Sequence, residues 1–228
     1  FVKNILVSNG VNQNKISVIP HGINNYVNFQ NCSKLESRIF FNLPNDAKVI
    51  LFFGNISPYK DLESLLELFY NNKISSNTYL IIAGKFRRGL NKYKRKILDL
   101  IHKSDNSDRI LFHNHFIDSN DIEKYFVASD ILCLPYKFIF QSGVLFLSYS
   151  MGLPVLARNV GGIAEDIEEG VTGHIYNHQS DLNNALQLAF KNKNLKKGML
   201  LREYCKTRYD WSNIVDDTIK TYSDQSGK

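Results

Sequence analysis

Residues 141–173 read QSGVLFLSYSMGLPVLARNVGGIAEDIEEGVTG, and glycine-bearing turns alternate there with short apolar runs. Glycine is used where a backbone turns with a positive φ or approaches another group closely. Turns of this kind at the carboxyl ends of parallel strands build phosphate and nucleotide sites. The stretch therefore predicts βα units of a parallel sheet with a phosphate or nucleotide site at one edge.

The segments on either side continue the same alternation. Val49–Phe53 is an unbroken apolar run of strand length, which suits a parallel strand buried on both faces. Apolar residues at helical spacing follow it over 62–69. Alternation up to residue 190 predicts an α/β fold: a doubly wound, Rossmann-like parallel sheet with helices on both faces. We expect strands at 15–19, 49–53, 79–83, 109–112, 130–134, 154–158 and 173–176, and helices at 33–41, 62–69, 93–102, 121–129, 142–151, 163–168, 182–190, 199–204 and 212–222.

The composition is that of an ordinary globular protein. Of 228 residues 43% are hydrophobic and 22% charged, enough to bury a core. The three cysteines show no CxxC or Cys/His spacing, so we expect reduced thiols in a cytosolic compartment, Cys133 in the core and no metal site. The sequence has neither an 18-residue apolar run nor a signal peptide. Because it starts with Phe1 rather than Met, we expect a fragment or a processed product, with a disordered tail over 224–228.

Positive charge is concentrated in one stretch. The net charge is +6, and residues 85–96 contain no acidic side chain. A basic patch attracts anionic lipid, nucleotide phosphates or nucleic acid. The alternative is a solvated helix face without a partner, and the sequence leaves these options open.

The turn after the strand at 49–53 carries a candidate phosphate ligand. Gly54 and Asn55 begin the turn, and Lys60 ends it just before the next helix. A long, positively charged side chain at this place can reach a diphosphate that lies across the sheet edge.

The helix expected at 142–151 offers a second phosphate site at its start. A helix N-terminus has free N–H groups and a partial positive charge. Gly143 lets the backbone approach an anion, and Ser142 caps the helix or contacts the phosphate. The alternative is a simple N-cap with no ligand.

Other polar residues follow further strands. Gly162 and Glu165 lie after the strand at 154–158, where Glu165 either contacts a ligand or caps a short helix. Gly84 ends the strand at 79–83. His113 and His115 follow the strand at 109–112 on one face, and without a Cys or carboxylate partner they make a poor metal site.

These turns, in this order and spacing, resemble the nucleotide-sugar-binding half of a GT-B glycosyltransferase of family 4, glycosyl transferases group 1. The resemblance runs from about Val18 to Tyr222 and implies the C-terminal, donor-binding domain of a larger enzyme. It implies that catalytic residues lie in the missing N-terminal domain. The implied donor diphosphate-binding residues are Gly54, Asn55, Lys60, Ser142, Gly143 and Val144, and the implied donor sugar- or nucleoside-binding residues are Gly84, His113, His115, Gln141, Gly162 and Glu165.

The chain departs from the family at three positions. Asn55 stands where members usually have an arginine, although the following lysine is kept as Lys60. Two glutamates usual in the family would fall at Ile139 and Leu147. A bacterial subgroup looks like this chain, with Pro-Tyr-Lys after the first strand and Gln-Ser-Gly-Val at the helix start. The resemblance then implies that Gln141 takes over ribose or sugar contacts.

The resemblance also implies a division of the chain and a reaction. Residues 1–19 would end the N-terminal domain and form the crossover, 20–210 would bind the donor, and 211–228 would form a C-terminal helix and tail. The implied enzyme is a retaining, metal-independent hexosyltransferase that moves a sugar from a nucleoside-diphosphate sugar to an acceptor hydroxyl, without a cofactor, in bacterial lipopolysaccharide, O-antigen or capsule synthesis.

The implied partners are the nucleotide sugar, a saccharide or lipid-linked saccharide acceptor and the missing N-terminal domain. The implied location is cytoplasmic, with peripheral contact at the inner membrane, and the isolated domain is expected to be inactive. Two other classes stay open: a non-catalytic nucleotide- or phosphate-binding regulatory module, and a nucleic-acid-binding α/β protein, which the basic stretch alone motivates. We expect no nucleic-acid partner.

Overall fold

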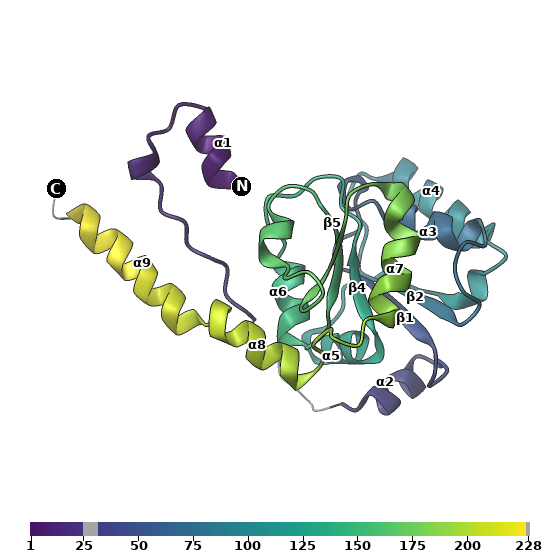
Figure 1. Ribbon diagram of the computed structural model, residues 1–228. Helices are drawn as coiled ribbons and strands as arrows, with labels where there is room; N and C mark the ends of the chain where they lie inside the picture. Colours follow the sequence, from purple (N-terminus) through teal and green to yellow (C-terminus); the bar gives the residue numbers. More distant parts are fainter. Residues whose placement is uncertain (25–31, 227–228) are drawn as a thin grey trace.

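The computed structural model describes residues 1–24 and 32–226, and its centre is one parallel sheet (Figure 1). Within these residues six strands pair in the order β3-β2-β1-β4-β5-β6. The doubly wound sheet predicted from the apolar runs is confirmed. The strands are β1 (Lys48–Phe53), β2 (Thr78–Ala83), β3 (Ile110–His113), β4 (Ile131–Leu134), β5 (Val155–Arg158) and β6 (Gly173–Tyr176).

Alternating side chains of the central strand build two cores, one on each face of the sheet. In β1, Val49 and Leu51 join one cluster, whereas Ile50 and Phe52 join the other. All four are almost fully buried, as expected for a strand covered on both faces.

Helices cover both faces (Figure 1). Apolar residues of α5, α6 and α8 belong to the first core, and those of α3, α4 and α7 to the second. The helices are α1 (Val2–Ser8), α2 (Lys34–Phe40), α3 (Leu62–Tyr70), α4 (Asn91–His102), α5 (Ser119–Ala128), α6 (Gly143–Ser150), α7 (Leu182–Lys191), α8 (Met199–Tyr209) and α9 (Trp211–Ser226).

Three predictions were wrong: two concern the ends of the chain, and one concerns the turn after β5. No strand forms over 15–19 in the described structure: a 3-10 turn covers Gln13–Lys15, and Val18 is 70% exposed with no neighbouring strand to supply ladder hydrogen bonds. The helix expected at 163–168 is a shorter 3-10 turn, Ile163–Asp166. The tail expected to be disordered is helical as far as Ser226, while residues 227–228 lie outside the described residues.

The two ends of the chain project together from the sheet, at the left of Figure 1. They are joined at their base, where the Trp211 indole donates a hydrogen bond to the Ile23 carbonyl at 2.7 Å. Gly22 has room for no side chain there, because a Cβ would lie 2.4 Å from the Trp211 ring. The His21 ring stacks on Phe146 of α6 at 4.6 Å, which fixes this base against the domain.

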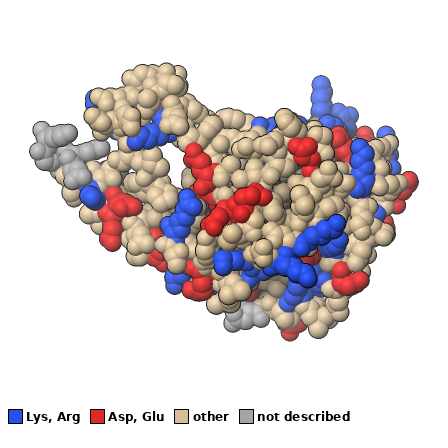
Figure 2. Space-filling view, in the orientation of Figure 1, with Lys and Arg blue, Asp and Glu red and all other residues tan. Residues whose placement is uncertain are grey.

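The structure gives the positions of the cysteines and of the basic stretch 85–96. Cys133 is completely buried in the second core, as predicted, and all three cysteines are free. The basic stretch 85–96 forms the loop after β2 and the first half of α4, and Lys and Arg side chains gather at the upper right of Figure 2, where Figure 1 places α4.

Candidate functional site

The strand order reverses direction between β1 and β4, and this reversal places the site. From β1 the chain builds outward through β2 and β3, and from β4 it builds the other way through β5 and β6. Parallel α/β sheets bind ligands outside the carboxyl ends of the strands at such a switch point. The turn with Lys60 follows β1 and the start of α6 follows β4, so the two predicted phosphate-binding segments flank it.

The structure brings three predicted diphosphate residues together. Gly54 has φ +95°, and a Cβ added to it would lie 3.0 Å from Lys60 Nζ and 3.5 Å from Val144 Cγ2. A side chain at residue 54 would therefore crowd the lysine amine and the first turn of α6. Asn55, the next residue, is exposed and adds no charge.

Lys60 is buried although it has no carboxylate partner among the described residues. Its side chain is 5% exposed, and its amine donates a 3.4 Å hydrogen bond to the Phe53 carbonyl. The amine also lies 5.4 Å from the centre of the Tyr136 ring, within cation–π range. Burial lowers the pKa of Lys60 to about 8. A desolvated cation of this kind attracts an anion.

The start of α6 lies beside this amine and has an open approach. Ser142 is the N-cap residue, buried, and its side chain accepts no capping hydrogen bond. A Cβ added to Gly143 would meet nothing within 4 Å, so packing within the described protein does not require glycine there. The first N–H groups of a helix have no partner inside the helix, and here a ligand can reach them. Gln141, just before the cap, is exposed.

Gly84 and the two histidines end the neighbouring strands. A Cβ on Gly84, which has φ +148°, would lie 2.0 Å from the Gly54 carbonyl oxygen, so close packing of two loops requires this glycine. His113 Nδ1 is 2.8 Å from the Tyr125 hydroxyl, and burial lowers the pKa of His113. The His113 and His115 rings stack at 6.0 Å, and both line a hollow of about 510 Å³ between β3, α5 and the end of α2.

The Gly161–Gly162 turn packs on the loop before α6. Gly161 has φ +61°, and a Cβ there would lie 1.5 Å from the Ile139 carbonyl oxygen, which also accepts a 3.3 Å hydrogen bond from the Gly162 N–H. Glu165 is 63% exposed and accepts a 2.6 Å hydrogen bond from the Phe1 nitrogen. These glycines are thus explained by contact between two loops, and ligand contacts of Gly162 and Glu165 stay a prediction.

Ile139 and Leu147, at the two positions where the family usually has glutamates, both pack in or against the first core. Leu147 is buried there, and Ile139 packs against it from the loop before α6. Neither place supplies a carboxylate to the switch point.

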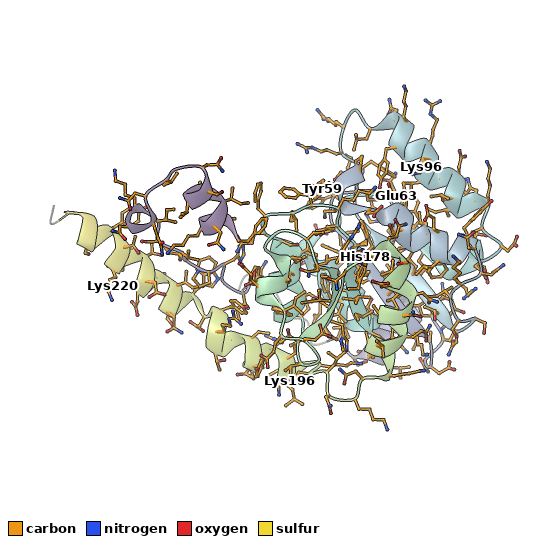
Figure 3. The ribbon with its side chains drawn as sticks, turned by 45° about the horizontal axis from the view of Figure 1, so that its top comes forward. Tyr59, Glu63, Lys96, His178, Lys196 and Lys220 are labelled. Carbon is orange, nitrogen blue, oxygen red and sulfur yellow. The ribbon has the colours of Figure 1, made fainter. Side chains whose placement is uncertain are left out.

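Sequence reasoning missed a group of charged residues beside Lys60. Asp61 and Glu63, at the start of α3, meet Lys137 from the loop after β4, with Nζ distances of 3.0 and 2.9 Å. Figure 3 shows Glu63 close to Lys96 of α4 in the same region. The pair of acids directly after Lys60 was the available signal, but acids in the first turn of a helix are common for other reasons.

Residues 1–24 and 32–226 hold no cluster of three or more His, Cys, Asp or Glu side chains arranged for a metal ion. None of the helices in that part of the chain has the length and hydropathy needed to cross a membrane.

The sequence matches the family model described as glycosyl transferases group 1 over residues 33–207. It is 24% identical to an uncharacterized glycosyltransferase from Methanocaldococcus jannaschii, over 92% of this chain and 54% of that protein. It is 27% identical to the lipopolysaccharide 1,2-N-acetylglucosaminetransferase of Salmonella typhimurium, over 92% of this chain and 58% of that protein. The chain therefore spans about half the length of these curated relatives.

Solved structures show the same fold. The complex of Anabaena HepE with UDP and glucose superposes with a TM-score of 0.82 at 19% identity, covering 97% of this chain and 60% of that one. Sucrose-phosphate synthase from Thermosynechococcus elongatus gives a TM-score of 0.80 at 21% identity, covering 99% of this chain and 56% of that one. These matches and the family model confirm the resemblance drawn from the glycine turns. The chain belongs to the glycosyl transferases group 1 family and forms the C-terminal, Rossmann-like domain of a GT-B fold.

Proposed function

We propose that this domain binds the donor of a glycosyltransferase that moves a sugar from a nucleoside-diphosphate sugar to an acceptor hydroxyl. The observation that carries the proposal is the buried Lys60 amine, which faces the open first turn of α6 across the switch point. A diphosphate leaving group gains negative charge as the bond to the sugar breaks. Fixed positive charge and oriented N–H groups stabilise that charge most where water is excluded.

The similar structures support a nucleotide sugar as the ligand. HepE was solved in complex with UDP and glucose, and the fold of this chain superposes on it. We assign contacts with the leaving diphosphate to Lys60, Ser142, Gly143 and Val144. In the same proposal Gly54 leaves space for the Lys60 amine, and Asn55 donates an uncharged hydrogen bond to the diphosphate. Gln141, Gly84, His113, His115, Gly162 and Glu165 are the proposed sugar and nucleoside contacts. The proposal includes neither a cofactor nor a metal ion.

The acceptor and the other half of the enzyme belong to the same proposal. Apolar side chains are exposed on α1 and on α9, among them Leu6, Val7, Val215 and Ile219. Exposed apolar surface on two projecting segments favours cover by another domain, here the N-terminal domain. We propose a retaining hexosyltransferase in the cytoplasm that extends a saccharide or lipid-linked saccharide for a bacterial surface polysaccharide, with this domain inactive by itself.

Calorimetric titration of the 228-residue chain with UDP, GDP, ADP and CMP tests donor binding. We expect one nucleoside diphosphate to bind and Lys60→Met to weaken it by about 10- to 100-fold, the size of a lost charge-assisted hydrogen bond. Lys73→Met, at an exposed site outside the candidate site, is the matched control. Equal binding by wild type and Lys60→Met would contradict the proposal, as would competition by duplex DNA.

Gly143→Ala tests whether the phosphate approaches α6. A methyl group fits without contact inside 4 Å, so we expect the free energy of unfolding to change by no more than about 0.5 kcal/mol. The same methyl would stand where the anion approaches, and we expect diphosphate affinity to fall about 10-fold. Urea denaturation and calorimetry measure the two effects. Unchanged affinity would show that the ligand does not reach this turn.

A regulatory function is the one alternative that a specific observation favours. Ile139 and Leu147 bring apolar side chains where the family usually has glutamates, which favours a non-catalytic nucleotide- or phosphate-binding regulatory module. Sugar transfer by the full-length protein, lost in Lys60→Met, would reject this alternative. Diphosphate binding without transfer by the full-length protein would favour it.

A further inference from the structure

Asp61, directly after Lys60, combines two unfavourable features. Its backbone has φ +52° and ψ +43°, the left-handed region that residues other than glycine rarely adopt. Its side chain is 2% exposed, and a buried carboxylate is costly unless cations or donors face it. Strained residues of this kind persist where the surrounding structure holds them, and they cluster at functional sites.

Cations from two other segments face the Asp61 carboxylate. Lys137, in the loop after β4, places Nζ 3.0 Å from Oδ1, and Arg158, at the end of β5, places Nη1 3.8 Å from Oδ2. The Lys137 amine also lies 2.9 Å from Glu63 Oε1. This one amine therefore ties the start of α3 to the loop after β4.

Glu63 is held as a charged partner for Lys137. The Tyr93 hydroxyl donates a hydrogen bond to Oε2, and Lys96 Nζ lies 3.7 Å from Oε1, as the neighbouring positions of Glu63 and Lys96 in Figure 3 show. Burial by itself would raise the pKa of Glu63, but hydrogen bonds from Tyr93 and Lys137 keep it below its ordinary value. Lys137 thus contacts the carboxylates of both Asp61 and Glu63.

The loop that Lys137 anchors contacts both parts of the candidate site, the Lys60 turn and the start of α6. The Lys137 N–H donates a 2.7 Å hydrogen bond to the Tyr59 carbonyl, next to Lys60. The preceding residue, Tyr136, covers the Lys60 amine with its ring. The same loop ends at Ser142, the cap of α6. The separation between the amine and the helix start therefore depends on how this loop is fixed.

We propose that Asp61 and Lys137 are positioning residues: their ion pair holds the Lys60 amine and the first turn of α6 at the separation that lets one diphosphate contact both. The inference rests on the proposed donor-binding function. Neither side chain touches the ligand; they act through the strained turn and the anchored loop. This role also accounts for a residue other than glycine at the left-handed position 61, because glycine would supply no carboxylate for Lys137.

The informative variant removes both charges together. Lys137→Met alone leaves Asp61 and Glu63 without their shared amine, so it is expected to lower stability. The double variant Asp61→Asn/Lys137→Met leaves no uncompensated carboxylate at residue 61, Glu63 keeps Tyr93 and Lys96 as partners, and asparagine tolerates a left-handed backbone. We expect its thermal unfolding midpoint to stay near that of the wild type, while diphosphate affinity falls about 10-fold.

Two further variants separate positioning from structure. Lys137→Arg keeps the charge and should bind diphosphate within about 3-fold of the wild type. Lys96→Met removes a more exposed cation from the same Glu63 and should leave affinity unchanged. Wild-type affinity in the double variant would overturn the proposal.

Chemical labelling of Lys60 needs no ligand, so it tests the positioning role independently of the proposed donor binding. Acetylation of Lys60 by acetic anhydride, followed by mass spectrometry across pH, measures burial and titration of the amine. In the double variant we expect the labelling profile to titrate higher, from about 8 towards the 10.5 of a free lysine, and the limiting rate at high pH, where the amine is neutral in both proteins, to be faster because the amine is more exposed. If the wild type binds no diphosphate but this shift occurs, the donor function fails while the positioning of Lys60 stands. An unchanged labelling profile overturns the positioning role.

Discussion

Lys60→Met is expected to stabilise the folded chain at pH 7 while it weakens diphosphate binding. Burial lowers the pKa of Lys60 from 10.5 to about 8, so the fold disfavours the charged amine. The difference corresponds to a gain on the order of 3 kcal/mol when the charge is deleted and the apolar stem is kept. A site residue that costs stability is expected where function requires a desolvated charge.

The sign of the pH dependence follows from the two pKa values. Below pH 8 the amine is charged in both the folded and the unfolded chain, so the full cost is present. As the pH rises from about 8 towards 10.5 the folded chain releases its proton first, and the cost disappears. The stability gap between Lys60→Met and the wild type should therefore be largest below pH 8 and close by about pH 10.5.

Urea denaturation from pH 6 to pH 10.5 measures this gap, with Lys73→Met as the exposed control that should show none. A loss of stability in Lys60→Met at pH 7 would contradict the prediction. It would mean that the Phe53 carbonyl and the Tyr136 ring compensate the buried charge in full.

Gly161→Ala is expected to destabilise the fold by about 3 kcal/mol or more. The added Cβ would lie 1.5 Å from the Ile139 carbonyl oxygen, which is backbone and cannot rotate away, and the residue has φ +61°. Collision with backbone and a left-handed conformation act together at this one position. The loop before α6 would have to move, so diphosphate affinity should fall as well.

Gly89→Ala separates the two causes. Gly89 has φ +82°, but a Cβ there meets nothing within 4 Å. We expect this control to lose only about 1–2 kcal/mol, the cost of the left-handed backbone alone. Equal losses for the two variants in urea denaturation would show that the contact with Ile139 relaxes without cost.

Local sequence signals were sufficient for most of the fold. The apolar run Val49–Phe53 predicted a strand buried on both faces, because a strand covered on both sides has no position for a polar residue. Lys60 was predicted as a phosphate ligand because it follows that strand at the sheet edge, and the structure places its amine near the start of α6. The strand expected at 15–19 was wrong because periodicity does not report whether a neighbouring strand exists.

Contacts between distant segments could not be predicted in the same way. The ion pair between Asp61 and Lys137 joins two loops that meet only when β1 and β4 pair. Gly84 and Gly162 were predicted to contact a ligand, whereas at each position a Cβ would collide with the carbonyl oxygen of another loop. A glycine in a sequence reports that space is short, but only the fold shows whether protein or ligand fills it.

The low pKa of Lys60 has a consequence for how binding is coupled to solvent. Burial lowers the pKa of this amine to about 8, so near that pH part of the folded population holds it without its proton. A diphosphate bound beside it would favour the charged form, so binding near pH 8 would draw protons from the buffer. The heat of binding then contains the ionisation enthalpy of the buffer, and the affinity declines as the solution becomes alkaline. Donor capture by this domain would be, in part, a proton-uptake reaction.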